Sequence, residues 1–111
     1  MSCLFCKMAT GEIPVEFLMN SDRIFAIADI APQAPIHILI IPKIHQESAA
    51  GLAGSDPQLL AEMFKVAGEL AKTYGLDGYR SVFNTGESAG QSVFHAHLHL
   101  LGGRPFAWPP G

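Results

Sequence analysis

The sequence predicts an α+β domain built on a largely antiparallel sheet. One long stretch carries apolar residues at helical spacing, and short runs rich in β-branched and aromatic residues precede and follow it. These runs do not alternate with helices as the strands of a parallel sheet would. A chain of 111 residues can bury a core of its own, so we expect residues 1–111 to form a single domain.

The N-terminal part predicts a helix, a hairpin and a buried strand. Residues 3–9 are expected to form a short helix that ends at Gly11, and residues 15–28 a β-hairpin. Residues 36–41 are almost all aliphatic, which is typical of a strand buried on both faces. The exception is His37, and a buried imidazole needs a hydrogen-bonding partner.

The long helix is expected to begin at Ser55. Gln58 follows three residues later, as in a capping box, and Pro57 occupies the first turn, where a missing N–H costs nothing. Apolar residues then recur at helical spacing up to Tyr74, and Gly75 ends the helix.

Two strands and an irregular tail are expected to complete the chain. Residues 79–84 and 92–101 have the composition of strands, and a glycine-rich loop at 85–91 connects them. The tail that follows is too rich in proline for regular structure. We therefore expect residues 36–41 and 92–101, the most aliphatic strands, to lie at the centre of the sheet.

Three of the five histidines of the chain stand in the last of these strands. At the two-residue period of a strand, His95, His97 and His99 share one face, while apolar residues occupy the other. Neighbouring members are separated by roughly 6.6 Å and the outer two by about 13 Å, so all three cannot bind one metal ion from a straight strand. A merely polar, solvent-facing strand is the alternative, but strands do not favour histidine.

The glycine-rich loop before this strand predicts a phosphate site. Gly86 and Gly90 allow backbone N–H groups to approach an anion, and Ser92 adds a hydroxyl where the strand begins. A neutral imidazole beside such a site can attack phosphorus. An ordinary hairpin loop is the alternative interpretation of the glycines. A metal-assisted hydrolase would need carboxylates that are absent near the strand.

Cys3 and Cys6 form the only cysteine pair in the chain, a Cys-x-x-Cys motif. Such a pair can be half of a zinc site, a redox pair or two small buried residues. A redox pair is expected after a strand in a βαβ unit, whereas this pair opens the chain. Two thiolates supply half of a tetrahedral zinc site, so two further ligands are required.

Charge and composition limit the partners. Seven Lys and Arg against ten Asp and Glu give a net charge of −3, which argues against a nucleic-acid polymer or an anionic membrane. No segment resembles a membrane span or a signal peptide, so we expect a cytoplasmic protein. Hydrophobic residues make up 49%, which indicates that a second copy covers some apolar surface. We expect a homo-oligomer.

The sequence His-Ala-His-Leu-His-Leu-Leu at residues 95–101 resembles the signature of the histidine triad (HIT) superfamily, and in particular its nucleotide-binding branch. The resemblance extends from Phe5 to Gly111. Its other matching positions are residues 29–30, 32–35, 41–43, 90–92, 101–104 and 108–111, together with His37 and Asn84. It implies a HIT-like fold, with an antiparallel sheet of about five strands, one long helix and a short N-terminal helix.

The resemblance implies a purine nucleoside phosphoramidase that cleaves the P–N bond of adenosine 5′-phosphoramidates through a covalent nucleotidyl-histidine. By position, His97 is the nucleophile, His99 contacts the phosphate, and His37 lies behind His97. Asp29 matches the ligand of the ribose hydroxyls, and Ile30 lies beside an AMP-type or GMP-type purine base. The matching contacts to the phosphate and the leaving group are Asn84, Gly90, Gln91 and Ser92. No organic cofactor is implied.

The resemblance also bears on the cysteines and on assembly. Well-known eukaryotic members of this branch lack Cys3 and Cys6, whereas several bacterial relatives have them and bind a structural zinc with residues that match His45 and His95. This leaves His97 and His99 free of metal. Family members are homodimers in which the tail, here Trp108, reaches the partner's site. The alternatives are a non-catalytic nucleotide-binding adaptor dimer and a dinucleoside polyphosphate hydrolase of the same superfamily.

Overall fold

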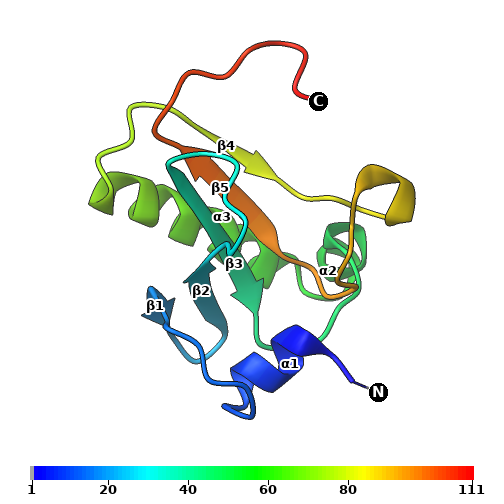
Figure 1. Ribbon diagram of the computed structural model, residues 1–111. Helices are drawn as coiled ribbons and strands as arrows, with labels where there is room; N and C mark the ends of the chain where they lie inside the picture. The colour runs from blue at the N-terminus through cyan, green and yellow to red at the C-terminus, as the bar shows by residue number, and fades with distance from the viewer. Residues whose placement is uncertain (1) are drawn as a thin grey trace.

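The computed structural model describes residues 2–111, and its centre is a five-stranded antiparallel sheet in the order β1-β2-β3-β5-β4. Helices cover both faces, which confirms the predicted α+β class (Figure 1). The elements are α1 (Leu4–Ala9), β1 (Met19–Asn20), β2 (Ile24–Ala28), β3 (Ile36–Pro42), α2 (Ala49–Ser55), α3 (Pro57–Thr73), β4 (Tyr79–Val82), the 3-10 helix η1 (Glu87–Ala89) and β5 (Leu98–Gly102).

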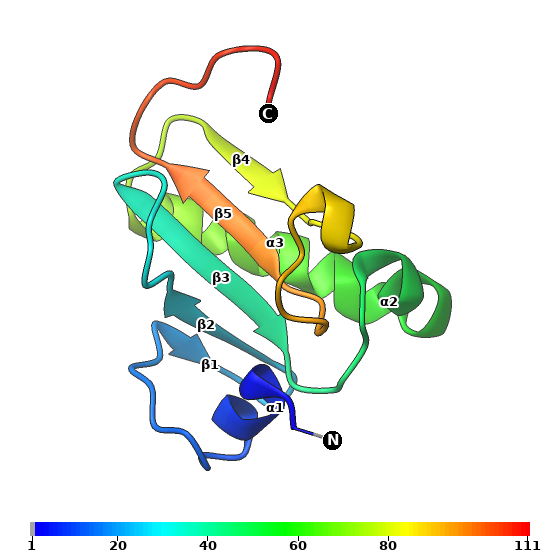
Figure 2. The same ribbon diagram turned by 45° about the vertical axis from the view of Figure 1, so that its right-hand side comes forward.

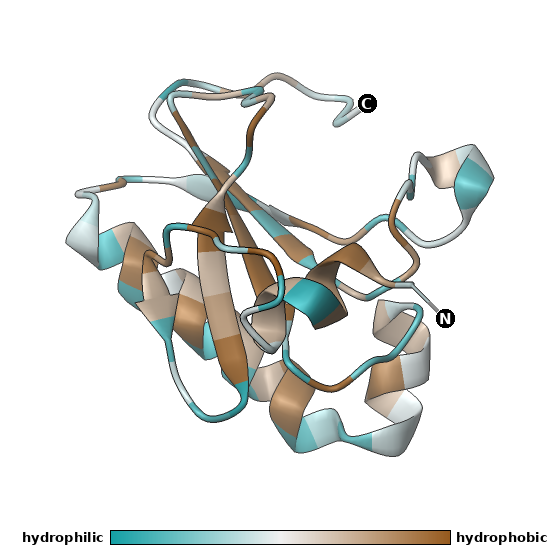
Figure 3. Cartoon of the chain, turned by 60° about the horizontal axis from the view of Figure 1, so that its bottom comes forward, coloured by the Kyte–Doolittle hydropathy of each residue, from teal (hydrophilic) through white to brown (hydrophobic). Residues whose placement is uncertain are grey.

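The larger of two apolar cores lies between the sheet and α3. Alternate residues of the strands face this helix, among them Ile38 and Ile40 of β3 and Leu98 and Leu100 of β5. All four are at most 3% exposed. The strands in the middle of the fold are accordingly coloured as hydrophobic in Figure 3. Twelve buried residues make up this core, so it holds most of the domain together.

The smaller core lies on the opposite face, under α1 (Figure 2). Phe5 of α1 packs there against the other set of strand residues, which includes Ile27 and Leu39. Only five buried residues belong to this core. A six-residue helix is not stable by itself, and so little burial leaves α1 dependent on further contacts.

The start of the long helix differs from the prediction. Ser55 is the last residue of a separate helix, α2, and Asp56 caps α3 by accepting a hydrogen bond from the N–H of Leu59. Pro57 does occupy the first turn. The segment at 49–54 consists of alanine, glycine and a single leucine, so it lacks the apolar stripe by which α2 could have been recognised.

The histidine strand is shorter than expected. β5 begins at Leu98 rather than at residue 92, because its partner β3 ends at Pro42, which has no N–H to continue the ladder. The N–H of Ala96 donates instead to the carbonyl of Gln46. Similarly, β1 is confined to Met19–Asn20 and β4 ends at Val82.

The C-terminal tail follows β5. Residues after Gly102 form no helix or strand, as predicted, and in Figure 1 they extend beyond the sheet. Among residues 2–111, no helix combines the length and the apolar character needed to span a membrane.

Candidate active site and metal-binding cluster

The five histidines gather in two neighbouring clusters around the smaller core. His37, His97 and His99 form the first, and His45 and His95 belong to the second. His37 stands on β3 and His99 on β5, while His95 and His97 lie in the irregular segment before β5. His45 follows β3 in the connection to α2. The clusters meet at His95 and His97, which are two residues apart in the chain.

His97 has one nitrogen engaged and one available. Its Nδ1 lies 2.7 Å from the carbonyl oxygen of His95, and a carbonyl only accepts, so Nδ1 carries the proton. Nε2 of a neutral ring then keeps its lone pair. The side chain is 8% exposed, and burial lowers the pKa of His97 from its usual value. The ring is therefore neutral at pH 7 and has the form of a nucleophile.

His37 contacts His99 rather than His97. Nε2 of His37 lies 2.9 Å from Nδ1 of His99 and 3.4 Å from Oδ2 of Asp29. The strand register explains this contact: β3 pairs His37 with Leu101 and Leu39 with His99, so the histidine of β5 beside His37 is His99. Burial, with the nearby His97 and His37, lowers the pKa of His99 to about 4.

The glycine-rich loop is held by Gln91. This side chain is 4% exposed and accepts from the N–H of Gly86 at 2.9 Å. Its amide nitrogen donates to the carbonyls of Glu47 and Val93. Both ends of the amide are thus engaged within the protein. Gly86 and Gly90 have φ angles of 92° and 94°, which favour glycine.

The other predicted nucleotide contacts lie at the surface. Asp29 follows β2 and accepts from the N–H of Ala31 through Oδ1 at 2.8 Å, which orders the turn. Ile30 beside it is fully exposed. Ser92 is exposed and Asn84 is half-buried.

Phe5 is a site residue that the sequence did not reveal. Its ring is 3% exposed and makes edge-to-face contacts with His97, at 5.0 Å between centroids, and with His95, at 5.7 Å. The available signal was its position between Cys3 and Cys6, two residues after the first and one before the second. The helix that carries the cysteines therefore also contacts the candidate nucleophile.

Cys3, Cys6, His45 and His95 form the second cluster, and their ligand atoms all lie within 4.8 Å of one another. Nδ1 of His95 is 3.4 Å from Sγ of Cys3 and 3.6 Å from Sγ of Cys6. Nδ1 of His45 is 3.4 Å from Sγ of Cys6 and 3.2 Å from Nδ1 of His95. A tetrahedral centre with two sulfur and two nitrogen ligands requires about 3.6 Å for S···N and about 3.3 Å for N···N. The residues fit such a centre.

Neighbouring groups prepare His95 for this role. Its Nε2 donates to the carbonyl of Pro42 at 2.8 Å, so the lone pair is on Nδ1, the atom that faces the cysteines. Burial and the adjacent Cys3 raise the pKa of the Cys6 thiol, and a bound cation would favour its thiolate.

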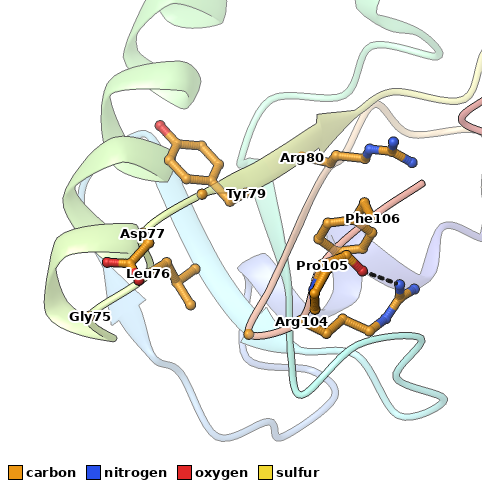
Figure 4. Close-up of a pocket in the computed structure, with 10 residues that line it drawn as sticks. Gly75, Leu76, Asp77, Tyr79, Arg80, Arg104, Pro105 and Phe106 are labelled. Atoms are coloured by element: carbon orange, nitrogen blue, oxygen red, sulfur yellow. Dashed lines mark hydrogen bonds between the residues drawn. The ribbon is translucent and has the colours of Figure 1, made fainter. Parts of the chain in front are cut away.

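A separate cavity lies beside β4 and the tail (Figure 4). It has a volume of about 630 Å³ and is lined by residues 75–80 and 103–106. The guanidinium groups of Arg80 and Arg104 lie over the ring of Phe106, at 5.0 and 4.3 Å from its centroid. None of the predicted site residues lines this cavity.

Comparison with known proteins identifies the family. Residues 10–106 match the family model described as the HIT domain. The chain belongs to the HIT family. The fold of this HIT protein is that of a HIT family hydrolase from Legionella pneumophila, with a TM-score of 0.94, 50% identity, and coverage of 99% of this chain and 100% of the other. The predicted HIT-like fold is thus confirmed.

Two further relatives are informative. A 14 kDa zinc-binding protein of Zea mays is 46% identical over 112 residues, which cover 97% of this chain and 87% of that protein. A histidine triad nucleotide-binding protein from Candida albicans superposes with a TM-score of 0.82 at 34% identity, over 97% of this HIT protein and 83% of that chain.

Proposed function

We propose that this HIT protein is a purine nucleoside phosphoramidase that hydrolyses the P–N bond of adenosine 5′-phosphoramidates and related nucleotidyl-amines. The observation that carries the proposal is the state of His97: a buried, neutral imidazole whose Nδ1–H is engaged by the carbonyl of His95, which leaves the lone pair on Nε2. The hydrolase from Legionella pneumophila and the nucleotide-binding protein from Candida albicans support this class of activity.

In the proposed reaction, Nε2 of His97 attacks phosphorus and the bond to the amine breaks, which gives nucleotidyl-His97. The bond from Nδ1–H to the carbonyl of His95 stabilises the positive charge that develops on the ring. Water then attacks phosphorus and releases AMP and neutral His97. The amine takes a proton from solvent as it leaves in the first step, and the second step returns one to solvent as the hydroxyl of the water goes to phosphorus, so one water molecule is consumed overall.

The remaining residues bind the nucleotide in this proposal. His99 donates to a phosphoryl oxygen, Asp29 accepts from the ribose hydroxyls, and Ile30 covers the purine. Ser92, Asn84 and the backbone at Gly90 contact the phosphate and the leaving group. Gln91 orders the loop from within, since both ends of its amide are engaged.

We further propose that Cys3, Cys6, His45 and His95 bind a structural zinc ion. Thiolate and imidazole are the ligands that zinc prefers, the distances fit a tetrahedron, and a relative from Zea mays is named as zinc-binding. Zinc would supply a cross-link between α1 and the segment before β5. No step of the reaction involves it.

We also propose that the protein is a homodimer in the cytoplasm. β4 is an edge strand, and exposed Tyr79 on this strand and Phe64 on α3 are apolar side chains that a second copy would cover. Trp108, also exposed, would then approach the partner's site. A reducing compartment suits the two free thiols. Sedimentation of a dimer, shifted toward monomer by Phe64→Glu, supports this assembly, and a monomer at all concentrations contradicts it.

The test of the activity is a panel of substrates offered to the purified protein. Adenosine 5′-phosphoramidate and AMP-amine conjugates should release AMP with a kcat/KM well above that for dinucleoside polyphosphates. The reverse order would favour the polyphosphate hydrolase. Tight AMP binding with no turnover of any conjugate would indicate a nucleotide-binding adaptor.

A further inference from the structure

Two backbone groups act on the neighbouring imidazoles His97 and His99. The carbonyl of His95 holds the proton of His97 on Nδ1. On the other side, the backbone N–H of Gln33 contacts the ring of His37, and this ring in turn contacts His99. The two ends of this arrangement present opposite kinds of group, an acceptor and a donor.

The backbone N–H of Gln33 donates to Nδ1 of His37 at a distance of 3.0 Å. An N–H that points at Nδ1 leaves no room for a proton there, so the ring proton of His37 is on Nε2. The amide is held in place from both sides. Arg104 donates to the carbonyl of Gln33 at 3.0 Å, and the side chain of Gln33 donates to the carbonyl of Ala31 at 3.0 Å.

The proton on Nε2 of His37 then determines the state of His99. The nearest acceptor is Nδ1 of His99 at 2.9 Å, while Oδ2 of Asp29 is more distant at 3.4 Å. Nδ1 of His99 therefore accepts. In a neutral ring the remaining proton is on Nε2, the nitrogen opposite to the one that His37 contacts.

We propose that the backbone amide of Gln33 fixes the tautomers of His37 and His99 and makes Gln33 a positioning residue. His99 becomes an N–H donor while His97, two residues away, remains an acceptor and nucleophile. That His99 donates to a phosphoryl oxygen rests on the proposed function; the tautomers themselves do not.

The same bond excludes a second metal site. Asp29, His37 and His99 offer three ligand atoms within 4.8 Å of one another, a set that could hold a cation. A cation would need the lone pair of His37 on Nε2 and hence a proton on Nδ1, where the N–H of Gln33 points. Gln33, His37 and His99 therefore form a hydrogen-bonded chain, and Asp29 lies beside it.

The test is a long-range ¹H–¹⁵N correlation spectrum of protein labelled with ¹⁵N-histidine, recorded at neutral pH without nucleotide. Each imidazole then reports which nitrogen carries the proton. We expect Nε2–H for His37 and His99 and Nδ1–H for His97. A spectrum in which His99 carries its proton on Nδ1 would overturn the proposal. Because no substrate is present, failure of the proposed reaction would leave this result unaffected.

Two substitutions of Gln33 separate the effect of its backbone N–H from that of its side chain. Gln33→Pro removes the N–H, so we expect His37 and His99 to lose their single Nε2–H form, with about a tenfold loss of kcat/KM. Gln33→Ala keeps the N–H, and Arg104 still holds the carbonyl of residue 33, so both rings should keep their Nε2–H form. Unchanged tautomers in folded Gln33→Pro would contradict the proposal.

Two further measurements do not depend on the folding of the proline variant. His37→Phe removes the donor to His99 and should convert His99 to a mixture of tautomers, whereas an unchanged pure Nε2–H form would count against the chain. Zn²⁺ added in excess should leave the resonances of His37 and His99 in place. A zinc-dependent shift of both would show that these residues form a metal site after all.

Discussion

The Nδ1 atom of His97 lies 2.7 Å from the carbonyl oxygen of His95. His95 is thus shared between two sites. Its side chain faces Cys3 and Cys6, while its backbone fixes the tautomer of the candidate nucleophile. Any movement of His95 within the cysteine–histidine cluster therefore also moves the carbonyl group that contacts His97, two residues further along the chain.

Cys6→Ser should destabilise the protein. Removing one ligand opens the cluster that ties α1 to the sheet, and the small core beneath this helix cannot replace it. We expect a loss on the order of 2–4 kcal/mol, comparable to that of a natural cross-link. Urea unfolding measures the loss. Lys7→Ala, on the same helix but outside the cluster, should stay within about 0.5 kcal/mol of wild type. Equal midpoints for Cys6→Ser and wild type, with and without a chelator, would contradict a metal cross-link.

Phe5→Leu should reduce activity more than stability. The substitution nearly conserves volume, so its cost should be about 1 kcal/mol, but the edge-to-face contact with His97 is lost. We expect a several-fold decrease in kcat/KM. Phe17→Leu is the control, because this more exposed ring makes a similar edge-to-face contact, with Phe25 at 5.5 Å instead of with a histidine. Equal activity in the two variants would show that Phe5 only fills space.

Gly90→Ala should cost about 1–2 kcal/mol. The residue has a φ of 94°, and an L side chain is strained in this left-handed region. The substitution should also distort the loop that Gln91 holds and lower kcat/KM. Gly78→Ala provides the control: its new Cβ meets open space and its φ is not positive, so stability should change little. Thermal unfolding of both variants separates two explanations. A lower Tm for Gly90→Ala alone indicates strain at this glycine, whereas an equal decrease in both variants would indicate a general effect of alanine in loops.

His99 should titrate far below an ordinary histidine. Its pKa is lowered from 6.5 to about 4 by burial and by the neighbouring imidazoles. Between these two values the unfolded chain binds more protons than the folded one, so stability rises with pH across this window and falls on acidification. Wild type should lose more stability from pH 6.5 to 4 than His99→Gln. An NMR titration midpoint near 6.5 for His99 would contradict this account.

The sequence predicted the fold class well, because the signals for helices and strands are local. The alternation of histidines and aliphatic residues assigned opposite faces to His99 and Leu100, and both lie as expected. The Cys-x-x-Cys spacing raised the possibility of a metal, and the resemblance to HIT proteins indicated the partners that the structure brings together in His45 and His95.

What the sequence missed depends on register and on backbone groups. The pairing of His37 with His99 follows from a strand register that spacing alone does not specify. The roles of the Gln33 amide and the Pro42 carbonyl belong to the main chain, which is the same at every position. The helix α2 escaped notice because alanine and glycine at 49–54 carry almost no periodic signal.

The most direct test of the central claim is a search for the covalent intermediate. Protein in excess over an AMP-amine conjugate is mixed, quenched in alkaline denaturant, digested and analysed by mass spectrometry. The account predicts an AMP adduct on the peptide that contains His97, localised to that residue, and its absence in inactive His97→Ala. Release of AMP without any adduct on His97, or an active His97→Ala variant, would contradict it.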